Sequence, residues 1–527
     1  GKVSIKATQA GNDEWLPAPD VIKTFEVIDH TAYPTEITIR RPYNETNVYL
    51  PELKPIIIST SLKVEHADAL HFEEVTASIE GETIELSTIA PNDPENGYFY
   101  AYWTPFRYGE HTMTISVTTS GGNVTTESAT FNITNEYDNL NIVTFDGDLK
   151  CTPSVHSAKG NYAMPTHIGA FNKIIAQYDH NCINGNCDPY DRIGGVKVRN
   201  YRGEWMELCR YTTPFGVECE DEIDVTDYTS VLQGLVEFEL YFESWDGSGY
   251  EPTLSFEMTK GDPEFDYVDV DEIWFNTYSF GDYANKQPVP IIEYTFDENT
   301  EAARLQLTTT GHNWSSGTNN TNNTGNAAEF YEATHNIHIN GTKEYDQHLW
   351  RTCTPNPAGC QPQNGTWTYN RSGWCPGSIA MVWNFDLTKY ATEGFAELFY
   401  EFDPSYLDEC HPNHPNCVDG YTCVKCDAPD NPVLRVSGKV VSLSNNISVL
   451  DGGSSAVPVN ENTVDFSINI YPNPATSTLN FSSDYEYGKL SVLIINAQGQ
   501  EVRRFTFDGS RSIDVSDLSS GVYFVKI

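Results

Sequence analysis

Residues 236–243 read Val-Glu-Phe-Glu-Leu-Tyr-Phe-Glu, and this stretch decides the fold class. Apolar side chains occupy every second position, which is the period of a β-strand with one face in a core. We therefore expect Glu237 and Glu239 to be solvated acids on the opposite face. Glu243 ends the strand beside Trp245, which makes it a better candidate for a functional site.

Short runs rich in Val, Ile, Thr, Tyr and Phe recur along the chain, separated by Gly, Pro, Asn and Asp, while helical periodicity is almost absent. This pattern is typical of antiparallel sandwiches and jelly rolls, and it predicts an all-β protein. We expect five parts. They are an immunoglobulin-like sandwich over 1–135, two further β units over 136–288 and 289–450, a linker over 451–466, and a small Cys-free β module over 467–527.

The chain of 527 residues carries 31 Lys and Arg against 74 Asp and Glu, a formal net charge of −43. Nucleic acids and anionic membrane surfaces are therefore poor partners, because both attract positive charge. We expect no membrane span, since no apolar run approaches the roughly 18 residues that a membrane helix needs. The opening Gly1-Lys2-Val3 fits a mature or trimmed product.

The twelve cysteines lie mostly in close pairs among Asn, Gly and Pro, which favours disulfides and an oxidising compartment. One group, Cys-x6-Cys-x5-Cys-x2-Cys over 410–426, has His411 and His414 nearby and invites a zinc interpretation. The first spacing is long for such a site, so two disulfides are the preferred interpretation. We expect no metal centre.

The densest candidate for chemistry is residues 182–192, Cys-Ile-Asn-Gly-Asn-Cys-Asp-Pro-Tyr-Asp-Arg. A tight Cys-x4-Cys loop would stiffen the turn that carries Asp188 and Asp191. A rigid carboxylate beside Arg192 suits a site that activates water. The alternatives are a calcium-like acidic loop and a surface Asp-Arg ion pair.

Two further segments are candidates. Residues 370–377, Asn-Arg-Ser-Gly-Trp-Cys-Pro-Gly, place Arg371 near Trp374, a combination that can grip a sugar, although Cys375 could simply fix a structural turn. Glu329 follows a polar loop and could be an ordinary solvated acid. No nucleotide-binding, serine-hydrolase or zinc-protease motif is present, and the scattered His and Met fit no copper hydroxylase, so we expect no cofactor.

From about 136 to 450 the sequence resembles the peptide:N-glycosidase F family of amidases. The resemblance is carried by short motifs in order: the 182–192 element, Gly-Glu-Trp at 203–205, Ile-Asp-Val-Thr-Asp at 223–227, Tyr-Phe-Glu-Ser-Trp at 241–245, Ala-Glu at 328–329, Thr-His at 334–335, Cys-x-x-Asn-Pro at 353–357, and 371–377.

The resemblance implies two eight-stranded antiparallel jelly rolls side by side, with the active site at their interface. It implies that Asp191 is the catalytic acid, assisted by Glu243 and Glu329. It also implies substrate contacts and two disulfides. The substrate contacts are Asp188, Tyr190, Arg192, Trp245, Arg371 and Trp374, and the disulfides are Cys182–Cys187 and Cys353–Cys375.

The implied reaction is hydrolysis of the Asn side-chain amide of N-glycoproteins by a monomeric enzyme without a cofactor. The chain departs from the family in having Tyr190 in place of Trp and no disulfide around Glu329. Cys209 and Cys219 are extra, and a Cys209–Cys219 pair is one guess for them. The alternative function is a non-catalytic glycan-binding or adhesion protein, against which the retention of Asp191 and both glutamates argues.

The C-terminal module resembles a type IX secretion sorting domain through Ile-Tyr-Pro-Asn-Pro-Ala at 470–475, a second motif at 492–500, and Leu-Ser-Ser-Gly-Val-Tyr-Phe-Val-Lys at 518–526. This implies a Bacteroidota-type cell and passage through the periplasm to the cell surface or the medium. The secretion machinery is the implied partner.

Overall fold

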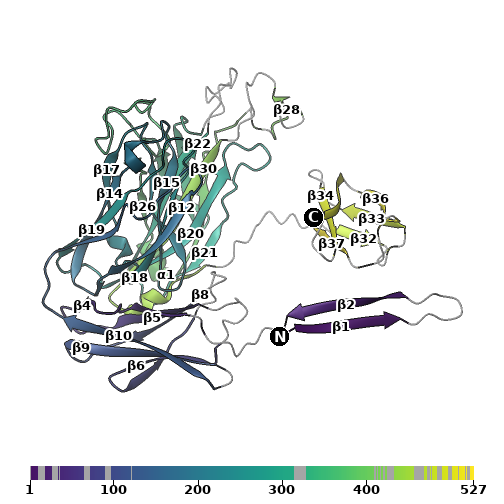
Figure 1. Ribbon diagram of the computed structural model, residues 1–527. Helices are drawn as coiled ribbons and strands as arrows, with labels where there is room; N and C mark the ends of the chain where they lie inside the picture. The colour runs from purple at the N-terminus through teal and green to yellow at the C-terminus, as the bar shows by residue number, and fades with distance from the viewer. Residues whose placement is uncertain are drawn as a thin grey trace. The chain divides into compact units, whose positions relative to one another are not determined.

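The computed structural model is almost entirely β-structure (Figure 1), which confirms the predicted fold class. It describes residues 36–63, 72–88, 96–119, 122–313, 328–408 and 432–455, the hairpin of β1 (Lys2–Gln9) and β2 (Ala18–Glu26), and shorter stretches elsewhere. The one α-helix of the described residues is α1 (Thr388–Glu393). The chain divides into a unit over Gly1–Val457 and a unit over Pro458–Ile527. No helix of the described part is long and apolar enough to cross a membrane.

The first jelly roll consists of two antiparallel sheets packed around one core. The four-stranded sheet has the order β11 (Leu140–Asp146), β19 (Thr253–Lys260), β14 (Phe171–His180), β17 (Cys219–Asp224). The facing sheet has the order β12 (Ser157–Met164), β18 (Gly234–Phe242), β15 (Ile193–Arg199), β16 (Trp205–Thr212), β25 (Ser378–Ile379). In β18 the apolar residues are buried in strict alternation, as predicted.

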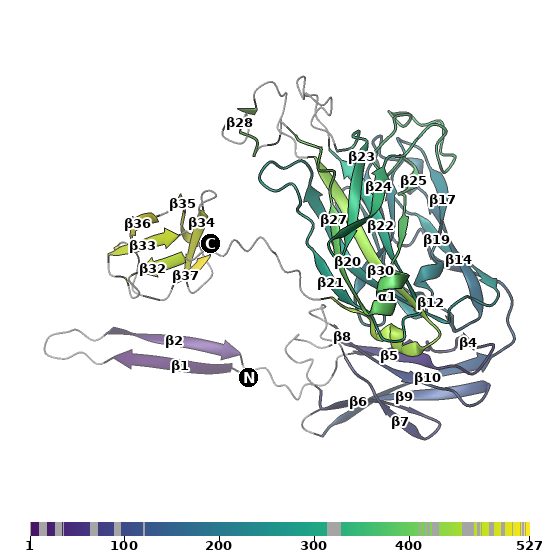
Figure 2. The ribbon, with the colours of Figure 1, turned by 180° about the vertical axis from the view of Figure 1, so that it is seen from behind.

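The second jelly roll repeats this plan, and its strands face the viewer in Figure 2. One sheet has the order β20 (Tyr267–Ser279), β30 (Val433–Ser444), β22 (Ala302–His312), β26 (Trp383–Asp386). The other has the order β24 (Thr342–Leu349), β23 (Ala333–Ile339), β27 (Phe395–Glu401), β21 (Ile292–Thr295), β31 (Ser454–Ser455).

Two of these strands cross the domain boundaries expected from composition. β20 falls in the segment 136–288, but it pairs along its length with β30 of the second jelly roll. β31 falls in the expected linker, but it pairs with β21. Alternation identifies a strand and its buried face, but it carries no information about the partner strand. The expected boundary at 288 therefore lies too late in the sequence, and the one at 450 lies too early.

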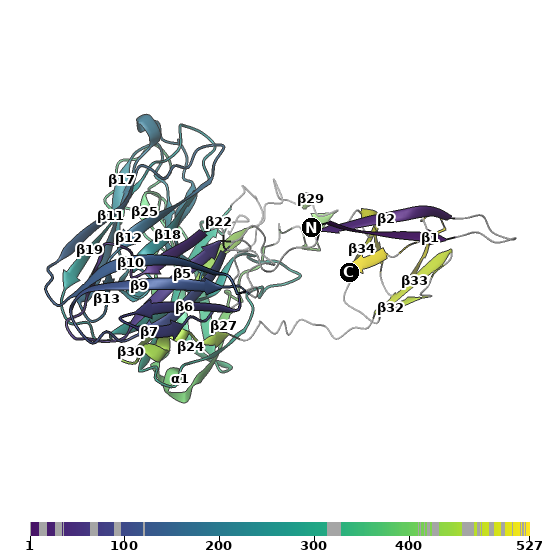
Figure 3. The same cartoon turned by 60° about the horizontal axis from the view of Figure 1, so that its bottom comes forward.

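The N-terminal domain is a two-sheet sandwich. Its smaller sheet is β3 (Glu36–Arg41), β5 (Ile56–Lys63), β8 (Asn96–Trp103). Its larger sheet is β13 (Thr166–His167), β4 (Asn47–Tyr49), β10 (Val124–Thr134), β9 (Gly109–Thr118), β6 (Glu74–Ile79), β7 (Glu82–Glu85). β5, β9 and β10 come to the front in Figure 3. β13 belongs to the chain of the first jelly roll, so the two domains share a sheet.

The two jelly rolls meet through apolar residues of β20 and β30, which join the first core, and through a buried polar group. Arg210 of β16 pairs with Glu207 at 2.9 Å and donates to Thr310 of β22 at 2.8 Å, although Arg210 and Glu207 are each only 2% exposed. The predicted solvation of Glu237 and Glu239 is wrong. Each lies opposite a cation, Arg199 at 3.3 Å and Lys197 at 3.7 Å, and each side chain is less than a fifth exposed. Neighbouring domains cover the polar face of β18. The alternation of apolar residues along one strand does not show whether its polar face is covered by another domain.

A cavity of about 1040 Å³ lies where the N-terminal domain meets both jelly rolls. It is lined by charged side chains and by Tyr98 and Trp205. Arg40 and Arg199 lie over the Tyr98 ring, while Arg199 and Lys159 lie over the Trp205 ring. None of the predicted site residues lines this cavity.

The C-terminal unit contains two three-stranded sheets. They have the orders β32 (Ile468–Tyr471), β33 (Thr478–Ser483), β36 (Ser510–Asp514) and β35 (Glu501–Phe507), β34 (Leu490–Asn496), β37 (Tyr523–Lys526). Val492, Ile494, Ile513 and Val515 form its small buried core.

Candidate active site

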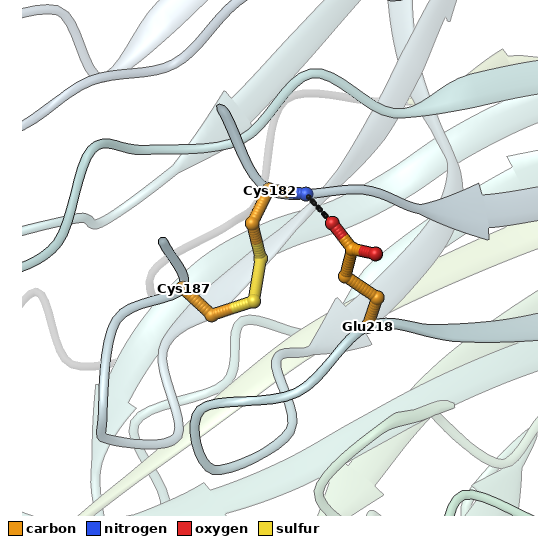
Figure 4. Close-up of side chains that lie close together, drawn as sticks. All are labelled: Cys182, Cys187 and Glu218. Carbon is orange, nitrogen blue, oxygen red and sulfur yellow. Dashed lines mark hydrogen bonds between the residues drawn. A yellow bond between two sulfur atoms is a disulfide. The ribbon is translucent and has the colours of Figure 1, made fainter. Parts of the chain in front are cut away.

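The loop that carries Asp191 is braced by a disulfide. Cys182 and Cys187 are joined across the turn that precedes it, and the Glu218 carboxylate accepts a hydrogen bond from the Cys182 backbone N–H at 2.9 Å (Figure 4). These three side chains have the spacing of a metal site. Both sulfurs are used in the disulfide, however, so no thiolate is available to bind a metal.

Asp188 lies beneath this loop rather than at its surface. Its side chain is 0% exposed, and its carboxylate accepts from Arg192 Nε at 2.8 Å and from the backbone N–H groups of Tyr190, Trp245 and Asp246 at 3.0–3.2 Å. The Asp188 side chain therefore has no exposed atom for the substrate contact that the resemblance implies. The buried carboxylate ties the Asp191 loop to the segment after β18.

Asp191, Glu329 and Arg371 meet at the junction of the two jelly rolls. Arg371 Nη2 lies 3.5 Å from Asp191 Oδ2, and Arg371 Nε donates to Glu329 Oε1 at 3.0 Å. The arginine is 0% exposed, while the side chains of Asp191 and Glu329 are 21% and 14% exposed. One buried guanidinium thus holds a carboxylate from each jelly roll, and both carboxylates keep a path to solvent.

Both acids have pKa values shifted toward neutrality. Burial raises the pKa of Asp191 to about 6, against the lowering effect of Arg371 and Arg192. Burial, together with repulsion by Asp191, raises the pKa of Glu329 to about 7, again against Arg371. Because the two acids interact, the values describe a coupled pair that titrates near neutral pH. Such values suit acid–base catalysis.

Arg371 is seated on Trp374 and held by its own loop. Its guanidinium lies 4.8 Å from the Trp374 ring centroid and donates to the carbonyl oxygens of Tyr369 at 2.7 Å and Thr366 at 3.2 Å. Trp374 is 2% exposed and donates from Nε1 to the Gly311 carbonyl oxygen. The Trp374 ring lies under the Arg371 guanidinium and is almost fully buried, so it has no exposed face for the glycan contact that the resemblance implies. Arg371 itself is equally enclosed, so it contacts the two acids rather than solvent.

Exposed aromatic side chains surround the acids. Tyr190 is 55% exposed, Trp245 59% and Tyr369 58%. Tyr190 and Trp245 come from the first jelly roll and Tyr369 from the second. Arg192, one-fifth exposed, lies against the Tyr190 ring at 5.1 Å. Flat exposed rings of this kind stack on sugar faces.

Glu243 lies at the same end of the sheet, since its backbone N–H donates to the Ile193 carbonyl oxygen at 3.0 Å. Its side chain is half-exposed and lies 3.6 Å from Arg435 Nη1 of β30. The pair spans the two jelly rolls at the edge of the site. Glu243 therefore borders the Asp191–Arg371–Glu329 group without an ion pair to it.

Arg435, Thr366 and Tyr369 also belong to the site, although none of them was predicted from the sequence. Arg435 sits within an ordinary strand pattern, and Thr366 acts through its backbone, so neither had a signal. Tyr369 could have been found, because it is an aromatic residue two positions before Arg371 in a loop rich in Asn, Gly and Thr.

Both implied disulfides, Cys182–Cys187 and Cys353–Cys375, are present. The guessed Cys209–Cys219 pair is wrong. Cys219 is joined to Cys360, and Cys209 is a free thiol buried in the first core. The predicted pairings among 410–426 lie outside the described side chains.

Family models match two parts of the chain. Residues 279–412 match the family model described as Peptide-N-glycosidase F, C terminal, and residues 469–527 match Secretion system C-terminal sorting domain. Over 257 residues the chain is 32% identical to peptide-N(4)-(N-acetyl-β-D-glucosaminyl)asparagine amidase F of Elizabethkingia miricola, covering 47% of this chain and 71% of that protein.

Solved structures of such amidases resemble the chain as well. One crystal structure, of a peptide-N(4)-(N-acetyl-β-D-glucosaminyl)asparagine amidase, is matched at a TM-score of 0.50 and 25% identity, over 61% of this chain and all of the other. A second, PNGase F from Flavobacterium meningosepticum, gives a TM-score of 0.49 and 26% identity with the same coverage.

The sorting domain confirms the predicted location outside the cell, in the medium or on the cell surface. The identity shared across most of the Elizabethkingia amidase, together with the double jelly roll, confirms the predicted family. This chain belongs to the family of peptide-N-glycosidase F, the peptide-N(4)-(N-acetyl-β-D-glucosaminyl)asparagine amidases.

Proposed function

We propose that the protein hydrolyses the side-chain amide that links Asn to the first sugar of an N-linked glycan. The products are Asp in the polypeptide and the intact glycan as a glycosylamine. The observation that carries this proposal is the pair of carboxylates, one from each jelly roll, on a single buried arginine. A protein that only binds glycans needs exposed aromatic rings, but it has no use for two acids that titrate near neutrality.

Asp191 acts as the general base. At neutral pH it is largely ionised, and it takes a proton from the water molecule whose oxygen attacks the amide carbon. Glu329 holds a proton more tightly, so it supplies a proton to the departing nitrogen as the carbon–nitrogen bond breaks. Water thus gives its hydroxyl to the carbon, and the nitrogen gains a proton.

Arg371 sets the distance between the two acids and keeps at least one of them ionised. Its donors are directed at Asp191, Glu329 and the carbonyl oxygens of its own loop. We therefore assign it a positioning role rather than a contact with the sugar.

Recognition of the glycan falls to the exposed rim. Trp245, Tyr190 and Tyr369 offer ring faces for sugars, and Arg192 and Glu243 offer a donor and an acceptor for hydroxyl groups. Both sides of the interface contribute, so a glycan chain would lie across the junction.

The substrates we propose are glycoproteins and glycopeptides met outside the cell, bound by a monomer. Nucleic acids are poor partners for a chain with a net charge of −43. The N-terminal domain contacts the far end of β18, where Arg40 donates to the Leu235 carbonyl oxygen, whereas Glu243 follows the other end. The N-terminal domain therefore lies away from the acids and supports the jelly rolls structurally.

The test is mass spectrometry of a defined N-glycopeptide incubated with the purified protein in heavy-oxygen water, with and without EDTA. The proposal predicts a free peptide in which Asn has become Asp with one solvent oxygen incorporated. Asp191→Asn is the matched inactive variant, and exposed Asp138→Asn is the control. If the glycopeptide stays intact while an immobilised form of the protein retains it, the chain is a glycan binder instead.

A further inference from the structure

The Cys219–Cys360 disulfide joins the two jelly rolls beside the candidate active site. Cys219 begins β17 of the first jelly roll, and Cys360 lies 141 residues later, in the segment between β24 and β25. The other two disulfides of the described residues close loops of 5 and 22 residues. Of the disulfides in the described residues, this one alone connects the two halves of the active site.

The segment that follows Cys360 carries the groups that hold Arg371. Arg371 donates to the carbonyl oxygens of Thr366 and Tyr369. This segment is docked on Phe215 of the first jelly roll, whose N–H donates to Gln363 Oε1 at 3.0 Å and whose carbonyl oxygen accepts from Asn364 N–H at 3.2 Å. The fit is close, because a Cβ added to Gly365 would lie 2.1 Å from the Phe215 ring.

Phe215 lies in the connection between β16 and β17, and this connection also contacts the Asp191 loop. Gly216 N–H donates to the Asp188 carbonyl oxygen at 3.1 Å, and Thr213 exchanges two hydrogen bonds with the backbone of Arg192 at 2.7 and 2.8 Å. Glu218, next to Cys219, accepts from Cys182 N–H. Residues 213–219 therefore touch the loop of Asp191 on one side and the loop of Arg371 on the other.

We propose that the Cys219–Cys360 disulfide is a positioning element of the amidase, which fixes the Arg371 loop against the Asp191 loop so that Asp191, Arg371 and Glu329 keep their catalytic geometry. This inference rests on the proposed amidase function. The contact at stake is the 3.5 Å pair between Arg371 and Asp191, which is already at the limit of a hydrogen bond. A small separation of the two loops breaks it.

Breaking that contact has a signature that simple loss of stability lacks. Asp191 faces two cations, Arg371 and Arg192, and two acids, Asp188 and Glu329. If Arg371 retreats, the remaining balance favours the protonated acid, and the pKa of Asp191 rises. Since the ionised form is the base, the acid limb of the activity profile moves to higher pH.

The experiment compares wild type with the double variant Cys219→Ser/Cys360→Ser on one N-glycopeptide, across pH and well below either unfolding temperature. Peptide mapping without reductant first establishes the Cys219–Cys360 linkage in wild type. We expect kcat/KM to fall on the order of 10- to 100-fold, mainly through kcat, with the acid limb displaced upward. Leu398→Ala, a buried position of the second core, is the control for loss of stability, and its acid limb should not move.

Gln363→Ala is the second variant, in case the double serine variant does not fold. It removes the acceptor for Phe215 N–H and the donors to Cys360 and Pro376 without touching a cysteine, and it should shift the acid limb in the same direction. Unlinked cysteines in wild type, or profiles that match wild type in both variants, would overturn the inference. A wild-type protein that cleaves no glycopeptide would instead count against the amidase proposal.

Discussion

Asp191 Oδ2 and Arg371 Nη2 lie 3.5 Å apart although 180 residues separate them in the sequence. The aspartate precedes β15 of the first jelly roll, and the arginine lies in the segment that runs from β24 of the second jelly roll to β25. The site therefore exists only when the two jelly rolls are assembled. Its chemistry depends on a buried cation that balances two acids.

Replacement of Asp191 by Asn should remove most of the activity while leaving the fold intact. The amide keeps the shape of the carboxyl group but cannot accept the proton of the attacking water. A lost general base costs about 10²- to 10⁴-fold in rate. Glycopeptide turnover measures the loss, and near-ultraviolet circular dichroism checks the fold. Activity close to that of wild type would move the role of base to another group.

The activity should have a bell-shaped pH dependence with both limbs near neutrality. Ionised Asp191 is needed, so the rate rises with pH through its pKa of about 6. Protonated Glu329 is needed, so the rate falls as pH passes its pKa of about 7. The limbs report macroscopic values of the pair. In Glu329→Gln the alkaline limb should disappear, and a persistent limb would contradict the acid role.

The same raised pKa values predict that the site lowers stability as pH increases. A carboxyl group whose pKa is higher in the folded state binds its proton more tightly when folded. Its stabilisation is therefore full below the ordinary pKa of 4.5 for Glu, and it is lost as pH rises through about 7 for Glu329. Urea unfolding at several pH values should show a smaller decline in Glu329→Gln than in wild type. An identical decline would show that Glu329 is not protonated more readily in the folded protein.

Two tryptophans near the site should behave in opposite ways when replaced by Ala. Trp245 is 59% exposed, so Trp245→Ala should raise KM for a glycopeptide and change the unfolding temperature little. Trp374 is buried beneath Arg371, so Trp374→Ala should cost about 3–5 kcal/mol of stability. Steady-state kinetics and calorimetry together separate the two. Equal effects of the two substitutions would contradict a structural role for Trp374 and a substrate-binding role for Trp245.

Asp188 should be needed for the Asp191 loop without touching the substrate. Its carboxylate accepts four hydrogen bonds while fully buried, so Asp188→Asn should cost about 1.5–3 kcal/mol and lower kcat. Asp246→Asn is the matched control. Asp246 also pairs with Arg192, but it is 57% exposed, and exposed pairs contribute little. A rise in KM alone in Asp188→Asn would favour substrate contact after all.

Local pattern predicted the parts of the site that belong to a single segment. The alternation of residues 236–243 placed β18 and its buried face, and the close cysteines around 182–192 marked the loop of Asp191. Ordered motifs shared with a known family implied Asp191, Glu243 and Glu329 as catalytic and Arg371 as a substrate contact. The structure brings Asp191, Glu329 and Arg371 together, and it encloses Asp188 and Trp374, which the same motifs had placed in contact with substrate.

The sequence by itself determined the all-β class, because apolar residues at every second position favour strands wherever they pair. It also determined the family and the secretion tail, because ordered motifs survive changes around them. Only the tertiary structure decided which residues are covered, which strands pair and which cysteines join. The burial of a residue by other segments, the pairing of strands and the Cys219–Cys360 disulfide all depend on segments more than a hundred residues apart. A local sequence pattern carries no information about such distant partners.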